Sequence, residues 1–162
     1  MLASIQFTNP ALTRAPVPPA AHKEQTMPND NAAAGMKFDD GKPDYTLVPW
    51  DCFGGATQRL IVPLYQWYRH GEPVASVVAE MRDAYNDRGL DYIALLADVL
   101  NYGAKKYAPW NWEKGISRRR LYAAACRHYK AILDGEEIDS ESGLPHTAHL
   151  AFYGVAISKA TD

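Results

Sequence analysis

The amino-acid sequence predicts an all-α protein, a packed bundle of about four to five helices, for three reasons. Apolar residues recur with the 3.6-residue period of amphipathic helices in several segments. Glycines, prolines and acidic runs separate those segments. The 162 residues, 47% hydrophobic and 22% charged, have the size and composition of one ordinary globular domain. We therefore expect a single helical domain over residues 36–162.

The first 35 residues differ from the rest of the chain. They contain five prolines and scattered alanines without a helical period, which predicts a disordered Pro/Ala-rich tail over residues 1–35. They lack the basic start and apolar middle of a signal peptide. Met27 and Met36 are alternative start positions, and Met36 opens the part that we expect to fold.

Two amphipathic segments follow, and we expect both to be scaffold. Residues 54–70 have an apolar side, but Pro63 should kink this helix or move its start later. Residues 73–85 have a second apolar side. These two apolar sides consist of Leu60, Ile61, Leu64 and Trp67, and of Val74, Val77, Val78 and Met81.

Residues 90–104 give the clearest helical pattern, a stripe of apolar residues with i, i+3, i+4, i+7 spacing. The stripe consists of Ile93, Leu96, Ala97, Leu100 and Ala104. Lys105, Lys106, Trp110, Asn111 and Trp112 follow at its end. Ammonium groups can neutralise phosphate and indole rings can stack on a base. The same residues also suit a helix C-terminus and the edge of a core, so both interpretations stay open.

The last part of the chain predicts a helix, an acidic loop and a second helix. Residues 118–133 form the first helix, with His128 on its apolar side, and Gly135 ends it. Pro145 opens the second helix, on which His146, His149 and Tyr153 share a face. Because short loops make consecutive helices antiparallel neighbours, we expect the three histidines to converge beside the acidic loop.

This histidine and carboxylate cluster predicts a metal site. Imidazole nitrogens and carboxylate oxygens bind divalent cations, and three inward histidines would be costly to bury without partners. The alternative is that the histidines are hydrogen-bonded core residues and that the acids are simply solvated. The acids in question are Asp134, Glu136, Glu137, Asp139 and Glu141.

Several protein classes are disfavoured by what the sequence lacks. The formal charge of −2 gives no broad attraction to nucleic acid, so none is expected as a partner. No apolar run approaches the roughly 20 residues that span a bilayer, so no membrane association is expected. Phosphate-binding glycine loops and GxSxG or CxxC pairs do not occur. Cys52 and Cys126 lie far apart, which favours buried thiols in a reducing, cytoplasmic location, although a disulfide between them is the alternative.

Motifs from residue 36 to 159 resemble the phage and bacterial dATP/dGTP diphosphohydrolase family of the MazZ type, distantly related to MazG-like all-α nucleotide pyrophosphohydrolases. The motifs are Lys37-x-Asp39-x-x-Lys42-Pro43, Gly103-Ala104-Lys105-Lys106-Tyr107, Asn111-Trp112, Ala125-x-Arg127-His128, Gly135-Glu136-x-x-Asp139-x-Glu141-Ser142-Gly143 and His146-x-x-His149.

The resemblance implies a fold, an activity and an assembly. It implies packed helices, a Mg²⁺-type metal, and hydrolysis of purine deoxynucleoside triphosphates (dGTP, dATP and, as an extension, GTP) to monophosphate and pyrophosphate. It also implies a homo-oligomer, dimer or tetramer, whose neighbouring subunits help to build each site. Phage members of the family act in nucleotide-pool remodelling for genomes that contain 2-aminoadenine, which would place the protein in the host cytoplasm.

The sequence departs from the MazG relatives in its expected metal ligands. Those relatives use carboxylates, where this chain has Arg127-His128 and His146-x-x-His149. Three imidazoles favour Mn²⁺, Co²⁺ or Zn²⁺ over Mg²⁺, or else some of the histidines act as acid, base or phosphate donor.

These considerations assign candidate roles. We expect Asp139, Glu136, His146 and His149 to hold metal, and Glu136, Glu141 and His128 to serve catalysis. Phosphate binding is expected of Lys105, Lys106 and Arg127. Base or nucleotide binding is expected of Lys37, Asp39, Lys42, Trp110, Asn111 and Trp112.

Two other functions remain open at this point. An HD-type triphosphohydrolase would release triphosphate, although the chain contains no His-Asp dipeptide. A zinc-stabilised helical module that binds single-stranded nucleic acid would unfold when its metal is removed, because structural metal binding is coupled to folding.

Overall fold

The computed structural model describes residues 41–162. The predicted tail over residues 1–35 and the candidate residues Lys37 and Asp39 therefore lie outside the described residues. Five α-helices make up most of the described chain, which confirms the prediction of an all-α helical bundle. The helices are α1 Val62–His70, α2 Val74–Asn86, α3 Tyr92–Lys106, α4 Arg118–Leu133 and α5 His146–Ala156.

Short elements connect and flank these helices. Two-residue strands β1 (Ile116–Ser117) and β2 (Ala160–Thr161) pair in parallel, with Ile116 opposite Ala160. They join the start of α4 to the segment that follows α5. Short 3₁₀ helices lie at Trp50–Cys52, Gln58–Leu60, Asn111–Lys114 and Ile157–Lys159.

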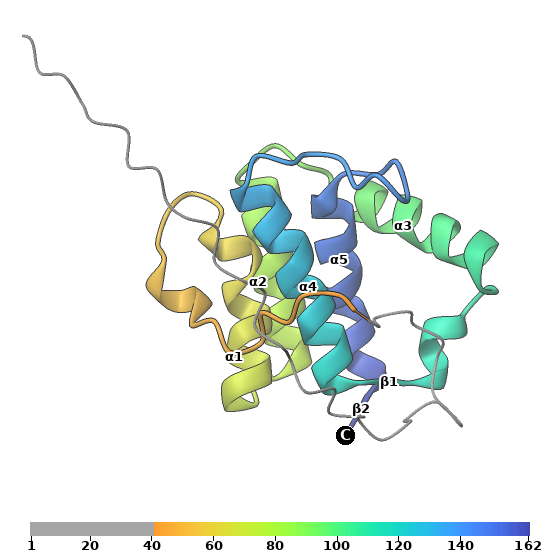
Figure 1. The fold of residues 1–162 in the computed structure, drawn as a ribbon, viewed down its shortest axis with the longest axis horizontal. Helices are drawn as coiled ribbons and strands as arrows, with labels where there is room; N and C mark the ends of the chain where they lie inside the picture. Colours follow the sequence, from red (N-terminus) through yellow and green to blue (C-terminus); the bar gives the residue numbers. More distant parts are fainter. Residues whose placement is uncertain (1–40) are drawn as a thin grey trace, which may run out of the picture.

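Helices α4 and α5 lie side by side and antiparallel at the centre of the molecule (Figure 1). Helices α1 and α2 cover one side of this pair, and α3 packs against α5 on the other side. Small residues on α5 allow this close approach: a Cβ added at Gly154 would lie 2.8 Å from the Met81 sulfur and 3.0 Å from the Tyr92 hydroxyl. The acidic loop between α4 and α5 reaches toward α3 at one end of the bundle (Figure 1).

The hydrophobic core lies among α1, α2, α4 and α5. Its fully buried large side chains include Leu60, Ile61, Leu64, Val77, Met81, Tyr85, Leu121, Tyr122, Tyr129 and Leu150. The segment before α1 adds Trp50, whose indole nitrogen donates to the Cys126 sulfur at 3.1 Å. Burying such large apolar side chains is the dominant favourable contribution to folding.

Several local predictions need correction. The first helix begins at Val62 and not near residue 54, which agrees with the alternative that Pro63 moves the start later. Gly54 and Gly55, which precede it, adopt positive φ angles of 63° and 93°. Cys126 is buried as expected, but Cys52 is exposed; both are free thiols. The turn at Trp50–Cys52 directs the indole inward and leaves Cys52 outside.

The apolar stripe predicted for α3 is also partly wrong. Ile93 is 65% exposed and Ala97 is exposed, whereas the buried residues are Tyr92 and Val99. Helix α3 lies at the edge of the bundle (Figure 1), so much of its surface has no covering helix among the described residues. Part of the predicted stripe, including Leu100, instead lines a cavity.

Within residues 41–162, no helix combines the length and the hydropathy that crossing a bilayer requires. The longest, α4, has 16 residues.

Candidate functional site

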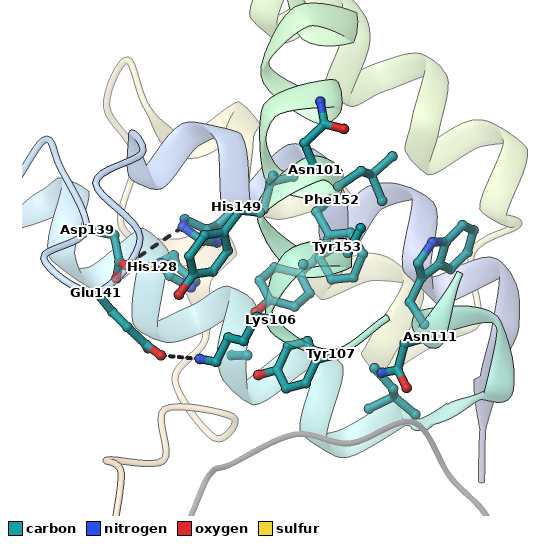
Figure 2. Close-up of a pocket in the computed structure, with 18 of the residues that line it drawn as sticks. Asn101, Lys106, Tyr107, Asn111, His128, Asp139, Glu141, His149, Phe152 and Tyr153 are labelled. Atoms are coloured by element: carbon teal, nitrogen blue, oxygen red, sulfur yellow. Dashed lines mark hydrogen bonds and ion pairs between the residues drawn. The ribbon is translucent and has the colours of Figure 1, made fainter. Parts of the chain in front are cut away.

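A cavity of about 970 Å³ lies between α3, α4, α5 and the acidic loop. Figure 2 shows charged groups gathered toward one end, with His128, Asp139, Glu141 and His149. Aromatic rings continue from there toward Asn111. The cavity therefore combines a charged end with an aromatic wall.

The backbone of α4 and α5 explains why the histidines meet. Ser117 caps α4 by accepting a hydrogen bond from the Arg120 N–H at 3.3 Å, and His128 then falls on the side of α4 that faces α5. On α5, His146 and His149 are one turn apart, and both are buried. The predicted convergence of the three histidines across one helix interface is confirmed.

Backbone hydrogen bonds fold the acidic loop against the histidines. Gly135 ends α4 with φ of 83°, and the Asp139 N–H donates to the Leu144 carbonyl at 2.9 Å. The Gly143 N–H returns to the Asp139 carbonyl at 2.8 Å. The His146 N–H donates to the Glu137 carbonyl at 3.0 Å, which joins the loop to the start of α5.

Ser142 links the Asp139 carboxylate to His149. The Asp139 Oδ1 accepts the Ser142 N–H at 2.8 Å and the Ser142 hydroxyl at 2.9 Å. The same hydroxyl lies 2.8 Å from His149 Nε2. Burial acts to raise the pKa of Asp139, but the Ser142 hydrogen bonds and the neighbouring His149 and His128 hold it below its ordinary value of 3.8. Asp139 is therefore a carboxylate at neutral pH.

The three imidazoles make two kinds of contact. The rings of His128 and His149 stack, with 4.3 Å between centroids and 2° between planes. His128 Nδ1 lies 2.8 Å from His146 Nδ1. The other nitrogen of His146, Nε2, is buried without a hydrogen-bond partner among the described residues and lies 3.6 Å from Glu136 Oε1.

His128, Asp139 and His149 can provide one metal ligand each. Their ligand atoms all lie within 4.8 Å of one another. Two imidazoles and one carboxylate suit Mn²⁺, Co²⁺ or Zn²⁺ well and accept Mg²⁺ less readily. This grouping contains Asp139 and His149 from the predicted ligand set and adds His128. The other two predicted ligands, Glu136 and His146, lie beside each other.

The predicted phosphate-binding residues occupy different places. Lys106 forms an ion pair with Glu141 across the cavity (Figure 2), and Arg127 also lines it. Although burial opposes the change, the Glu141 hydrogen bond raises the pKa of Lys106, and the Lys106 hydrogen bond lowers the pKa of Glu141. Lys105 is exposed and does not line the cavity.

The predicted base-binding residues lie along the aromatic part of the cavity. Trp110 is 68% exposed and has a left-handed φ of 61°. Asn111 is buried, and Trp112 packs edge-on against Phe152 with 6.4 Å between centroids. Lys42 also lines the cavity.

Sequence reasoning did not single out Tyr107, Phe152 or Ser142 as site residues, although each lies in or touches the site. Tyr107 and Phe152 line the cavity (Figure 2). Tyr107 and Ser142 belong to motifs that had been recognised, Gly103-Ala104-Lys105-Lys106-Tyr107 and Glu141-Ser142-Gly143, and this was the available signal. Nothing in the helical period of α5 distinguishes Phe152 from a core residue.

Comparison with protein families gives a match in the C-terminal part of the chain. Residues 90–161 match the family model described as dATP/dGTP diphosphohydrolase, N-terminal. No curated protein and no solved structure matches the chain. The matched segment runs from just before α3 to β2 and contains the histidine cluster, the acidic loop and Lys106.

Proposed function

Because residues 90–161 match the family model described as dATP/dGTP diphosphohydrolase, N-terminal, we propose that the protein hydrolyses dGTP and dATP to the monophosphate and pyrophosphate with the help of a divalent metal. The observation that carries this proposal is the grouping of His128, Asp139 and His149 at the charged end of the cavity. Lys106 and Arg127 lie on the same cavity and suit a polyphosphate.

His128, Asp139 and His149 would hold the metal, Mg²⁺ or, in better keeping with two imidazoles, Mn²⁺ or Co²⁺. Bound there, a divalent cation would offset phosphate charge and polarise a water molecule. Asp139 stays ionised for this role because Ser142 donates two hydrogen bonds to it.

The Lys106 and Glu141 pair suggests how the substrate engages. Phosphate oxygens of the incoming triphosphate would replace the Glu141 carboxylate as partner of the Lys106 ammonium. Glu141 would then accept the proton of the water that attacks the α-phosphorus. The bond from the α-phosphorus to its bridging oxygen breaks, and Lys106 and Arg127 stabilise the charge on the departing pyrophosphate.

The aromatic part of the cavity would receive the purine. Trp112 and Phe152 offer apolar surface, and the amide of the buried Asn111 can exchange hydrogen bonds with a base edge. We extend this role to Trp110 and Lys42, which line the same cavity. In a phage, such a reaction would remodel the purine deoxynucleotide pool for genomes that contain 2-aminoadenine.

We also propose that the protein works as a dimer or tetramer. The exposed apolar side of α3, with Ile93 at 65% exposure, supports this assembly because it offers surface for a second copy beside the cavity. Sedimentation analysis of the purified chain tests it, and a monomer at micromolar concentration would contradict it.

The activity is tested by incubating the protein with dGTP, dATP, GTP and pyrimidine deoxynucleoside triphosphates, each with Mg²⁺, Mn²⁺ or Co²⁺. We expect pyrophosphate from the purine substrates and its loss in His149→Ala. His70→Ala provides a matched control, because His70 is exposed on α1 and does not line the cavity. Release of triphosphate would instead establish an HD-type reaction, and no product from any substrate would overturn the proposal.

A further inference from the structure

We propose that His146 is not a metal ligand but a positioning residue, which together with Glu136 fixes the tautomer of His128 so that His128 presents Nε2 to the metal. This inference rests on the proposed metal site of His128, Asp139 and His149. It assigns to Glu136 and His146 a role that differs from the ligand role expected from the sequence.

The contact between His128 and His146 restricts where their protons lie. Their Nδ1 atoms are 2.8 Å apart, which is hydrogen-bond distance. Such a contact requires a proton on one Nδ1 and a lone pair on the other, because two lone pairs or two N–H groups would repel. Two neutral arrangements are therefore available, and the surroundings of His146 decide between them.

Glu136 favours one of these arrangements. The Glu136 carboxylate can only accept a hydrogen bond, and its Oε1 lies 3.6 Å from His146 Nε2. His146 Nε2 is buried and has no other hydrogen-bond partner among residues 41–162. A lone pair on Nε2 would face a negative charge, whereas an Nε2–H would face an acceptor that can move closer. Neutral His146 therefore carries its proton on Nε2 and has a lone pair on Nδ1.

The proton on His146 determines the state of His128. Since His146 Nδ1 accepts, His128 Nδ1 must donate, and neutral His128 then carries its lone pair on Nε2. Nε2 is also the His128 nitrogen not engaged by His146, so it is the atom that can face a metal shared with Asp139 and His149. The chain of side-chain contacts from Glu136 through His146 to His128 thus resembles the carboxylate and histidine pairs that orient metal ligands in other proteins.

The geometry also argues against His146 as a ligand. Its Nδ1 lies against His128 and its Nε2 lies nearest to Glu136, and His146 is not part of the group of ligand atoms that His128, Asp139 and His149 form. His146 itself is only 4% exposed, and burial in α5 holds the ring in this orientation. A buried imidazole held in one orientation can fix the orientation of the neighbouring His128 ring.

The tautomers can be measured directly in the wild-type protein. Long-range ¹H–¹⁵N correlation spectra of the ¹⁵N-labelled, metal-free protein distinguish Nδ1–H from Nε2–H imidazoles. We expect Nδ1–H for His128 and Nε2–H for His146. The opposite pair of tautomers would overturn the inference without the need for any variant.

Metal affinity gives a second measurement, made by calorimetric titration with Co²⁺ in the absence of nucleotide. We expect His146→Leu to weaken binding by about 10- to 100-fold, since this is the usual effect of losing an orienting partner. Glu136→Gln keeps an acceptor oxygen and should weaken binding by less than about threefold, whereas Glu136→Leu should approach the His146→Leu value. Glu137→Leu is the matched control, because Glu137 is exposed and its backbone carbonyl, which the substitution keeps, accepts the His146 N–H.

The outcomes separate this inference from the proposed function. The absorption spectrum of bound Co²⁺ should show the same coordination number in wild type and His146→Leu, but a changed one in His149→Leu. Tight Co²⁺ binding that His146→Leu leaves unchanged would overturn the inference and leave the metal site intact. Loss of a ligand in the His146→Leu spectrum would show that His146 binds metal, and absence of binding by the wild type would overturn the site itself. Far-ultraviolet circular dichroism identifies a variant that fails to fold, in which case His146→Gln replaces it.

Discussion

Lys106 forms an ion pair with Glu141 in the structure, whereas we propose that it binds substrate phosphate during turnover. Its ammonium binds Glu141 and lies 5.8 Å and 5.3 Å from the ring centroids of Tyr102 and Tyr107. These contacts hold a positive charge over the cavity before any substrate arrives. Positioned charge of this kind needs little rearrangement when negative charge develops on a leaving group.

We therefore predict that Lys106→Met lowers kcat/KM for dGTP by about 100-fold, the usual effect of removing one charge-stabilising donor. Lys114→Met serves as control, because Lys114 is exposed in the 3₁₀ helix Asn111–Lys114 and does not line the cavity. Steady-state kinetics with pyrophosphate detection measures both variants. Equal kcat/KM values in the two variants would contradict a role for Lys106 in phosphate binding.

The positions of the histidines could be predicted from the sequence, but the position of their carboxylate partner could not. The inward direction of His128, His146 and His149 follows from helical spacing, and the structure places all three in one cluster. The grouping of His128 with Asp139 does not follow from spacing. It depends on how Ser142 and the loop backbone direct the Asp139 carboxylate, and those hydrogen bonds have no period in the sequence.

At the scale of elements, α5 is predicted well and α3 only in part. Small residues and buried histidines on α5 fit a central helix, and its predicted start beside Pro145 agrees with the observed start at His146. The period of α3 correctly indicates a helix, but not which side is covered. Ile93 is exposed because α3 packs mainly against α5 and α2 among the described elements, and a helix at the edge need not bury every apolar residue.

The close packing of α5 against α2 and α3 predicts the effect of an added methyl group. Gly154→Ala would place a Cβ 2.8 Å from the Met81 sulfur and 3.0 Å from the Tyr92 hydroxyl. We expect a loss of about 1–3 kcal/mol in the free energy of unfolding, as overpacking usually costs. Urea denaturation measures it.

Gly103→Ala is the matched control for this variant, since a Cβ on that helical glycine of α3 meets nothing within 4 Å. It should stabilise the protein by up to about 1 kcal/mol, because alanine is the better helix former. Stabilisation of the same size in both variants would mean that helix propensity, and not the α5 contact, governs the result.

The segment before α1 is joined to α4 by Asp44, which predicts a pH dependence of folding. Asp44 accepts the Thr46 N–H at 3.0 Å and pairs with Arg119. Burial acts to raise the pKa of Asp44, but the Thr46 hydrogen bonds and Arg119 hold it below 3.8. Ionised Asp44 therefore contributes stability above the unfolded pKa, and this contribution is lost as pH falls through the lower folded pKa.

We expect Asp44→Asn to lower the free energy of unfolding at pH 7 by less than about 1 kcal/mol, because the ion pair is partly exposed. The difference from wild type should shrink as the pH is lowered through the range below 3.8. Thermal unfolding at a series of pH values measures it. A difference that grows on acidification would contradict the assigned contribution of the Asp44 carboxylate.

At the scale of the whole molecule, the hydrophobic core contains none of the three candidate metal ligands. The core residues of α1, α2, α4 and α5 pack together without the acidic loop. We therefore expect the fold to persist without a metal, unlike that of a zinc finger. This distinction separates the proposed enzyme from a zinc-stabilised binding module.

We predict that EDTA abolishes pyrophosphate release while the far-ultraviolet circular dichroism of the protein changes by less than about a tenth of the unfolding signal. Restoring Mn²⁺ or Co²⁺ should restore turnover, because a folded apo site can rebind its ion. The same sample serves both measurements. Loss of helical signal on chelation would instead support the structural-zinc alternative.

The paired strands β1 and β2 connect the two helices that carry the histidines at the end remote from the site. The loop closes the α4 and α5 hairpin at the histidine end, and the Ile116 and Ala160 pairing closes it at the other end. The two helices are thus connected at both ends, and these two connections lie about 16 Å apart along the 11 residues of α5. Because β2 ends at Thr161, we expect an affinity tag fused directly after Asp162 to disturb this pairing, so a long linker should separate the tag from the strand.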